Sequence, residues 1–230
     1  MVSIIIINYN TFELTCSCIK SIIEQTLEVN YEIILVDNNS SEKTERTFDD
    51  VFENKIKFIA SKTNLGFAGG NNLGISIALG EYILLLNSDT LLFEDSISKT
   101  VSFASKKNKV GAVTCKLLNS DLKSFQNAAR PFISLKRHFL NTFNLNKLFP
   151  QLELETQEKY NLNATFSSDW IWGTFFLFPK RNLNLMGGKL TENFFMYSED
   201  MEWSYIFYKN GLQNWYFSDT AIVHYGGQSS

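Results

Sequence analysis

The chain has 230 residues, of which 44% are hydrophobic and 20% are charged, and its formal net charge is −3. This length fits one domain or a small pair, and the charge gives no reason to expect a nucleic-acid partner. Three cysteines, Cys16, Cys18 and Cys115, are an odd number and predict reduced thiols in a cytoplasmic protein rather than a disulfide framework.

The chain opens with MVSIIIIN, which lacks basic residues and is too short to span a bilayer, so we expect a strand there. Further along, strand and helix signals alternate. Apolar runs predict strands at 3–7, 31–36, 55–59 and 82–86. Helices are expected at 12–25, from Ser40 or Ser41 to about residue 53, and at 71–79. Uninterrupted apolar strands imply a parallel sheet covered on both faces.

The second half of the chain has a less regular order. Candidate strands lie at 109–118 and 170–178, followed by a helix at 199–210 and an extended stretch at 215–224. Together with the first half, this pattern predicts an α/β protein.

Polar side chains follow three of the predicted strands. The first strand ends in NYN (8–10), the second in DNNS (37–40) and the fourth in NSD (87–89). Each stretch alone is also typical of helix caps and turns. Because the carboxyl ends of parallel strands meet at one edge of a sheet, the three together predict a polar ligand crevice.

The glycines of the chain gather in NLGFAGGNNLG (64–74), ahead of the helix expected at 71–79. Its backbone could approach a sugar or a phosphate closely, although a simple turn into the helix would look the same. The stretch NYNTFE after the first strand has no glycine, which argues against a dinucleotide-binding domain, and a Walker loop is absent. A sugar nucleotidyltransferase remains an alternative, but its usual Gly-rich loop with basic residues after the first strand is missing.

Seven motifs in order carry a resemblance to a known family: SIIIINYN, EIILVDNNSS, NLGFAGGNN, GEYILLLNSDT, DWIWGTFFLFPK, FFMYSEDMEWSYIFYKNGL and IVHYGGQSS. The chain resembles the inverting family-2 glycosyltransferases, most of all the branch that contains rhamnosyltransferases of bacterial surface polysaccharides. The match covers nearly the whole chain except 132–168. The resemblance implies the GT-A fold, an α/β/α sandwich with a mainly parallel central sheet. It also implies one domain over 1–230, with a nucleotide-sugar-binding half at 1–106 and an acceptor-binding and catalytic half at 107–230.

The same resemblance implies a nucleotide-diphosphate sugar donor and a divalent cation, Mn²⁺ or Mg²⁺. A cation suits the chemistry because the departing nucleoside diphosphate develops negative charge. Asp89 would anchor the cation and His224 would approach it, whereas a helix cap and a structural histidine are the alternatives. Asn87 replaces the first acid of the usual Asp-x-Asp motif, so phosphate oxygens and waters must fill much of the shell. The implied donor-binding residues are Asn8, Tyr9, Asn10, Asp37, Asn39, Asn64, Gly70, Asn71, Asn72, Asn87 and Ser88.

The implied reaction is sugar transfer with inversion to a glycan or lipid-linked acceptor. The motif YSEDMEW offers Asp200 as the base and Glu199 as an acceptor-orienting or structural group. Both acids would also suit a helix N-terminus. Trp170, Trp172 and Gly173 correspond to the acceptor side, where aromatic faces stack on sugar rings, although the tryptophans could equally belong to the core.

Departures from the family pattern, Asn87 and two others, leave a non-catalytic glycan-assembly partner as an alternative. Thr191 stands where relatives often have an acid, and Ile206 stands where they often have an arginine. A last expectation concerns 135–149, LKRHFLNTFNLNKLF, whose apolar stripe and three positive charges resemble an interfacial helix. Such a helix could hold the protein at the cytoplasmic membrane face, or it could simply pack on the domain.

Overall fold

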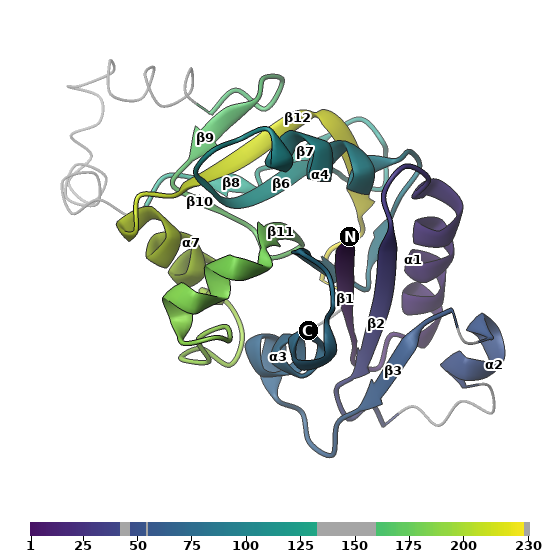
Figure 1. Cartoon of the computed structure of the whole chain (residues 1–230). Coiled ribbons are helices and arrows are strands. Elements are labelled where there is room, and N and C mark those ends of the chain that lie inside the picture. Colours follow the sequence, from purple (N-terminus) through teal and green to yellow (C-terminus); the bar gives the residue numbers. More distant parts are fainter. Residues whose placement is uncertain (42–46, 54, 133–159, 228–230) are drawn as a thin grey trace, which may run out of the picture.

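A computed structural model describes residues 1–41, 47–53, 55–132 and 160–227 (Figure 1). The strands are β1 Val2–Asn8, β2 Tyr31–Asp37, β3 Lys57–Ala60, β4 Tyr82–Asn87, β5 Thr90–Leu91, β6 Val110–Leu118, β7 Phe125–Gln126, β8 Ala129–Arg130, β9 Phe166–Ser168, β10 Trp170–Ile171, β11 Phe175–Pro179 and β12 Gln213–His224. The helices are α1 Phe12–Gln25, α2 Phe48–Phe52, α3 Gly66–Ile77, α4 Ser96–Ser105, α7 Glu199–Lys209 and the 3₁₀ helix η2 Lys180–Met186.

The central sheet has the strand order β3-β2-β1-β4-β11-β6-β12-β5, and β7 and β9 pair at β6 and β12. The first four strands of this order are parallel to one another, as the continuous apolar runs predict. Strand β11 is antiparallel to both β4 and β6, and β5 is antiparallel to β12. The sheet is therefore mixed, with a parallel half that ends at one common edge.

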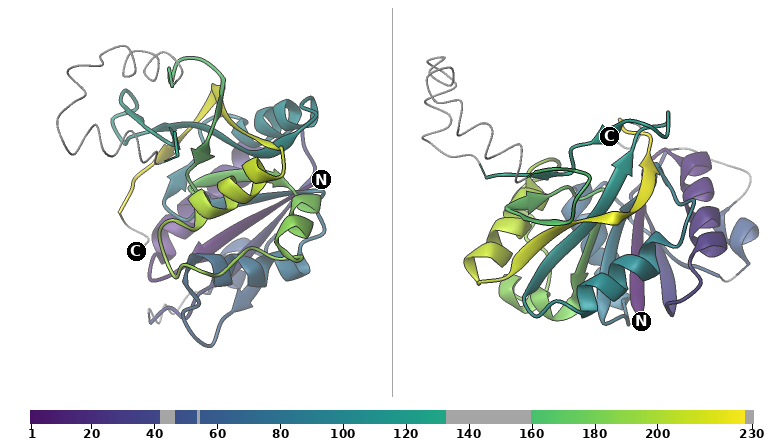
Figure 2. Two further views of the ribbon diagram at one scale, coloured as in Figure 1. Left: turned by 90° about the vertical axis from the view of Figure 1, so that its left-hand side faces the viewer. Right: turned by 90° about the horizontal axis from the view of Figure 1, so that it is seen from above.

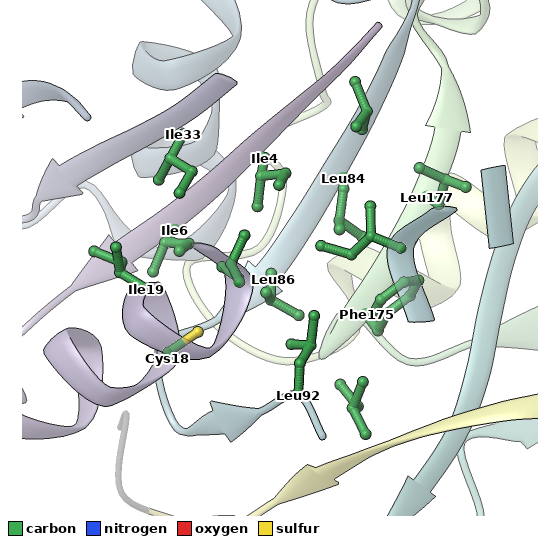
Figure 3. Packing of buried hydrophobic residues seen from close by; sticks show 14 of the residues in the cluster. Ile4, Ile6, Cys18, Ile19, Ile33, Leu84, Leu86, Leu92, Phe175 and Leu177 are labelled. Carbon is green, nitrogen blue, oxygen red and sulfur yellow. The ribbon is translucent and has the colours of Figure 1, made fainter. Parts of the chain in front are cut away.

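Helices cover both faces of this sheet. Successive residues of a strand point to opposite faces, so β1 packs against helices on both sides. Ile4 and Ile6 of β1 pack with residues of α1 on one side (Figure 3). Ile5 packs on the other side, in a cluster that includes residues of α3 and α7. Figure 2 shows α3 and α7 over the same face of the sheet. The result is a three-layer α/β/α arrangement that fits the all-apolar strands.

Helix α3 begins earlier than expected, at Gly66 rather than at residue 71. Each glycine in a helix interior costs about 1 kcal/mol, so propensity alone places the start too late. Close packing on β1 explains the helix: a Cβ on Gly70 would lie 2.9 Å from Ile7 Cδ1, and one on Gly74 would lie 2.6 Å from Ile5 Cγ2. These glycines let the helix approach the sheet.

Two further expectations need correction. Helix α2 begins at Phe48, where Thr47 and Asp50 form a capping box, and not at Ser40 or Ser41. The strand expected at 170–178 is two strands: β10 pairs with β8 in a small separate sheet, and β11 joins the central sheet. Residues 172–174, which include Gly173 and Thr174, carry the chain from one sheet to the other.

The predicted interfacial helix at 135–149 lies outside the described residues and stays a prediction. The division of the domain near residue 106 also stays a prediction. In the parts of the chain that are described, none of the helices is both long enough and apolar enough to cross a membrane.

Candidate active site

A cavity of about 560 Å³ opens where the carboxyl ends of β1 and β4 face the N-terminus of α7. It brings together residues from both halves of the chain that the sequence singled out separately. The predicted site residues that line it are Tyr9, Asn64, Asn87, Ser88, Trp170, Trp172, Gly173, Glu199, Asp200 and His224. The edge of the sheet therefore does form a crevice, as the polar strand ends predict.

Asn8 and Asp37 lie behind this lining rather than in it. The parallel register places them opposite each other on β1 and β2, and Asn8 Nδ2 donates to Asp37 Oδ1 at 2.7 Å. The oxygen of the Asn8 amide, Oδ1, accepts from Thr11 and Thr15 at 3.2 and 2.9 Å. Ser40 completes the group by donating its hydroxyl to Asp37 at 2.6 Å. These bonds brace the strand ends, and a direct contact with the donor stays a prediction.

The predicted asparagines of α3 contact protein in the same way. Asn71 is 1% exposed and donates to Phe67 O. Asn72 donates to Leu190 O at 2.9 Å and accepts from Leu190 N at 2.9 Å, which ties α3 to the loop ahead of α7. Gly70 faces Ile7. The Gly-rich segment thus organises helix and loop packing, and its contacts with the donor stay a prediction.

The turn residues Asn10 and Asn39 both adopt positive φ angles, 55° and 67°. Asn10 Oδ1 accepts from Ser41 N at 2.7 Å, which joins the loops that follow β1 and β2. Asn38, the residue before Asn39, has no individual role predicted from the sequence. In the structure it lines the cavity and donates to Asn64 Oδ1 at 2.9 Å. Its position at a polar strand end is the signal that could have found it.

Asp89 and His224 are brought together by backbone pairing. Thr90 of β5 is paired with His224 of β12, and Tyr225 N donates to Asp89 O at 3.0 Å. The Asp89 side chain is buried, and neither of its carboxylate oxygens has a hydrogen-bond partner among the described residues. The nearest basic group is His224 Nε2, 3.4 Å from Asp89 Oδ1. A carboxylate oxygen, the ligand type that hard divalent cations prefer, therefore lies next to an imidazole nitrogen, which is a common metal ligand.

The side chains of Asp89 and His224 fit a divalent cation. A buried carboxylate without donors is costly unless a positive charge compensates it. Among the described residues there is no cluster of three or more His, Cys, Asp or Glu side chains suited to a metal. Asp89 and His224 could thus contribute two positions, and diphosphate oxygens and waters would supply the others.

Two adjacent carboxyl groups stand at the N-terminus of α7. Asp200 accepts from Gly173 N at 2.9 Å through Oδ2 and from Met201 N at 2.8 Å through Oδ1. Burial raises the pKa of Asp200, and these N–H donors oppose that rise. Glu199 is 6% exposed, and its Oε2 has no partner among the described residues. Burial, followed by the charge of Asp200, raises the pKa of Glu199 to about 7.

The segment just before these carboxyl groups is strained. Tyr197 and Ser198 have φ angles of 68° and 76°, in the left-handed region that non-glycine residues rarely adopt, and both line the cavity. The same loop touches α3, because Phe195 O accepts from Phe67 N at 3.1 Å. Sequence patterns contain no signal for this conformation.

The predicted acceptor-side residues lie across the cavity from β1. Trp170 donates Nε1–H to Pro131 O at 3.1 Å, and the Trp172 ring lies 5.2 Å from the guanidinium of Arg130. Gly173 has its N–H on Asp200, and a Cβ there would lie 3.0 Å from the Phe67 ring. Both tryptophans are partly exposed, and Trp172 also packs against the hydrophobic core.

The mixed sheet between helices, with a polar crevice at the ends of its parallel strands, is the GT-A fold of glycosyltransferases. Solved structures confirm the fold. The chain superposes on Staphylococcus aureus TarS 1–349 in complex with UDP-GlcNAc with a TM-score of 0.65 and 18% identity, covering 99% of this chain and 60% of that one. It superposes on GalNAc-T7 with UDP, GalNAc and Mn²⁺ with a TM-score of 0.72 and 14% identity, covering 98% and 44%.

The family follows from sequence comparison: residues 3–171 match Glycosyl transferase family 2, and the chain belongs to this family. Glycosyltransferase GlyG of Streptococcus pneumoniae is 33% identical over 99 residues, 42% of this chain and 33% of that protein. The Escherichia coli UDP-Glc:alpha-D-GlcNAc-diphosphoundecaprenol beta-1,3-glucosyltransferase WfgD is 29% identical over 108 residues, 47% and 42% of the two chains. The match thus spans less than half the length of these curated relatives. The predicted rhamnosyltransferase branch stays a prediction.

Proposed function

We propose that the protein transfers a sugar from a nucleotide-diphosphate sugar to a glycan or lipid-linked acceptor, with inversion at the anomeric carbon. The observation that carries this proposal is the single cavity that joins Asn87 and Ser88, at the end of β4, to Glu199 and Asp200 on α7. A donor on the sheet edge would thereby face a carboxylate that can act as a base. Relatives named as UDP-glucose-dependent transferases support the donor class.

In this mechanism Asp200 takes the proton of the acceptor hydroxyl. The acceptor oxygen forms the new bond to the anomeric carbon, and the bond to the diphosphate oxygen breaks with its electron pair on the leaving group. Attack from the side opposite the leaving group inverts the carbon. Gly173 N–H fixes the Asp200 carboxylate at 2.9 Å, so the base is oriented before the acceptor binds.

Glu199 has a different role, because its pKa of about 7 leaves a substantial fraction of the carboxyl groups protonated near neutral pH. A carboxyl group that keeps its proton can donate a hydrogen bond to the acceptor or to the donor sugar. Trp170 and Trp172 offer ring faces to a sugar acceptor and reduce the access of water to the reacting atoms.

Asp89 and His224 would hold the divalent cation, Mn²⁺ or Mg²⁺. When bound there, the cation supplies positive charge to the departing diphosphate. The chain's own contribution is to hold a carboxylate and an imidazole 3.4 Å apart at the end of β4.

The acceptor proposed is a glycan or a lipid-linked sugar of bacterial surface polysaccharide synthesis. WfgD, whose name gives a diphosphoundecaprenol-linked sugar as the acceptor, supports a lipid-linked acceptor. The basic, amphipathic sequence at 135–149 would suit contact with an anionic membrane surface, where such acceptors reside.

The test begins with thermal melting against a panel of nucleotide sugars, each with Mn²⁺ or with EDTA. A donor raises the melting temperature by mass action, and 100-fold excess over the Kd contributes about 2.7 kcal/mol. The donor found is then incubated with the protein, and slow release of nucleoside diphosphate is followed. Asp89→Ala should lose the Mn²⁺-dependent part of the stabilisation. A protein that binds a nucleotide sugar but never releases the diphosphate, with or without acceptors, would instead be a non-catalytic partner.

A further inference from the structure

Gln126 of β7 contacts His224, one of the two candidate cation ligands. The imidazole ring of His224 could otherwise rotate away from the cation site. Gln126 Oε1 lies 2.6 Å from His224 Nδ1, on the side of the imidazole opposite Asp89. We infer that Gln126 is a positioning residue: it holds His224 in the tautomer that presents Nε2 to the cation site. The inference rests on the proposed function, because it assumes a cation between the protein and the donor diphosphate.

The direction of the Gln126 amide follows from a backbone atom. Gln126 Nε2 lies 2.9 Å from the carbonyl oxygen of His224, which can only accept a hydrogen bond. Turning the amide over would place two oxygens against each other there, so the nitrogen must face the carbonyl. Oε1 then faces Nδ1 of the ring and acts as an acceptor.

The tautomer follows in turn. Since Gln126 Oε1 accepts, His224 Nδ1 must carry the proton, and Nε2 of the neutral ring keeps a lone pair. That lone pair points to the side where Asp89 Oδ1 lies at 3.4 Å. A nitrogen lone pair and a carboxylate oxygen at this separation repel each other unless a proton or a metal cation lies between them. With the Nδ1 proton held by Gln126, Nε2 is the ring nitrogen that a cation there can bind.

Gln126 is itself held in place. Its second amide hydrogen goes to Asn119 Oδ1 at 2.8 Å, and Asn119 Nδ2 donates to Ser124 Oγ at 2.7 Å. The backbone pairing of Gln126 with Leu117 adds β7 to the sheet. An imidazole with a fixed partner on its far nitrogen is the usual arrangement for a metal-binding histidine, and loss of that partner typically costs 10- to 100-fold in metal affinity.

The first experiment reads the tautomer directly, without metal, donor or activity. The chain has two histidines, His138 and His224, so the ¹⁵N signals of the rings can be assigned with a His224→Ala spectrum. In wild type we expect His224 with a protonated Nδ1 and an unprotonated Nε2 at a pH where the ring is neutral. Gln126→Met should give a mixture of tautomers. Wild type with a protonated Nε2, or an unchanged spectrum in Gln126→Met, overturns the inference.

The second experiment measures Mn²⁺ affinity in the presence of UDP by the EPR signal of free Mn²⁺. Gln126→Met should bind Mn²⁺ about 10- to 100-fold more weakly, while UDP affinity in EDTA stays the same. Gln213→Met makes the same change at the far end of β12 and should match wild type. In a His224→Ala background, Gln126→Met should add no further loss. An equal loss in that background would mean that Gln126 acts independently of His224.

A failure of the proposed function and a failure of the inference about Gln126 give different results. If wild type shows no coupling between Mn²⁺ and UDP, the cation part of the proposed function falls, and the inference falls with it. If wild type shows the coupling and Gln126→Met retains it, only the inference fails. Melting temperatures report whether Gln126→Met is folded, and Gln126→Leu, which also removes the acceptor oxygen, replaces it if it is not.

Discussion

Glu199→Gln should stabilise the protein at neutral and alkaline pH. The carboxyl group of Glu199 is 6% exposed, and burial raises its pKa from 4.5 to about 7. Because the folded state binds this proton more tightly than the unfolded state, wild type loses stability as the pH rises between these two values. Glutamine keeps the shape of the protonated acid at every pH and does not incur that loss.

The size of the effect follows from the shift. A change from 4.5 to about 7 corresponds to about 3.5 kcal/mol, at about 1.4 kcal/mol for each pH unit. Solvent that enters the cavity screens the charge, so the expected gain above pH 7 is about 2 kcal/mol. At pH 4.5 the difference between variant and wild type should nearly vanish.

Urea denaturation between pH 4.5 and pH 8.5 measures this difference. Glu202→Gln is the matched control, since it removes one carboxylate from the first turn of the same helix at a residue hydrogen-bonded by Thr191 and Asn193. The control should not show a gain that grows with pH. A Glu199→Gln protein whose stability runs parallel to wild type across this range would refute the argument, because the carboxyl group would then not be held protonated.

Two other substitutions test the site and its frame. Asp200→Asn should leave donor affinity nearly unchanged and lower the rate of transfer by about 10²-fold or more, because the amide keeps the shape but loses the basicity; an equal loss at Glu199→Gln with none at Asp200→Asn would reverse the two roles. Gly66→Ala should cost about 2–4 kcal/mol in urea denaturation, since its φ is +69° and a Cβ would lie 2.2 Å from Phe195 O. Gly187→Ala has a similar φ of +76° with nothing within 4 Å, so it should cost only about 1 kcal/mol; equal losses would show that the contact with Phe195 does not matter.

Much of the sheet could be predicted because its strands are continuous apolar runs. β1, β2 and β4 each bury their residues on both faces, and such runs have few alternatives to a covered parallel strand. The start of α3 could not be predicted in this way. Its glycines oppose helix formation locally, and only the contacts of Gly70 and Gly74 with β1 explain why the helix forms.

The polar strand ends predicted where the crevice lies but not which side chains face it. Asn8 and Asp37 both end strands, yet the register pairs them with each other, and their hydrogen-bonding capacity is used inside the protein. Register is a property of two strands together and cannot be read from either one. Gln126 lies on a two-residue strand with no periodic pattern, so its contact with His224 could not be predicted from the sequence.

The buried carboxylate of Asp89 is a feature of the site that lowers the stability of the fold. Asp89 is 1% exposed, and its carboxylate oxygens have no hydrogen-bond partner among the described residues. Backbone pairing between β5 and β12 holds it beside His224. The position of both groups should therefore survive neutralisation of the carboxylate.

Asp89→Asn is thus expected to stabilise the metal-free protein while it impairs donor binding. The amide removes a buried charge and can donate to the lone pair of His224 Nε2, so we expect a gain of about 1–3 kcal/mol in urea denaturation with EDTA. With Mn²⁺ and UDP the order should reverse, because wild type gains stability from binding and the variant lacks the anionic ligand. Asp89→Ala serves as the control, since it removes the charge but leaves His224 without a donor. If Asp89→Asn is less stable than wild type in EDTA, the carboxylate is already compensated within the protein, and the pair is a structural contact rather than a prepared cation site.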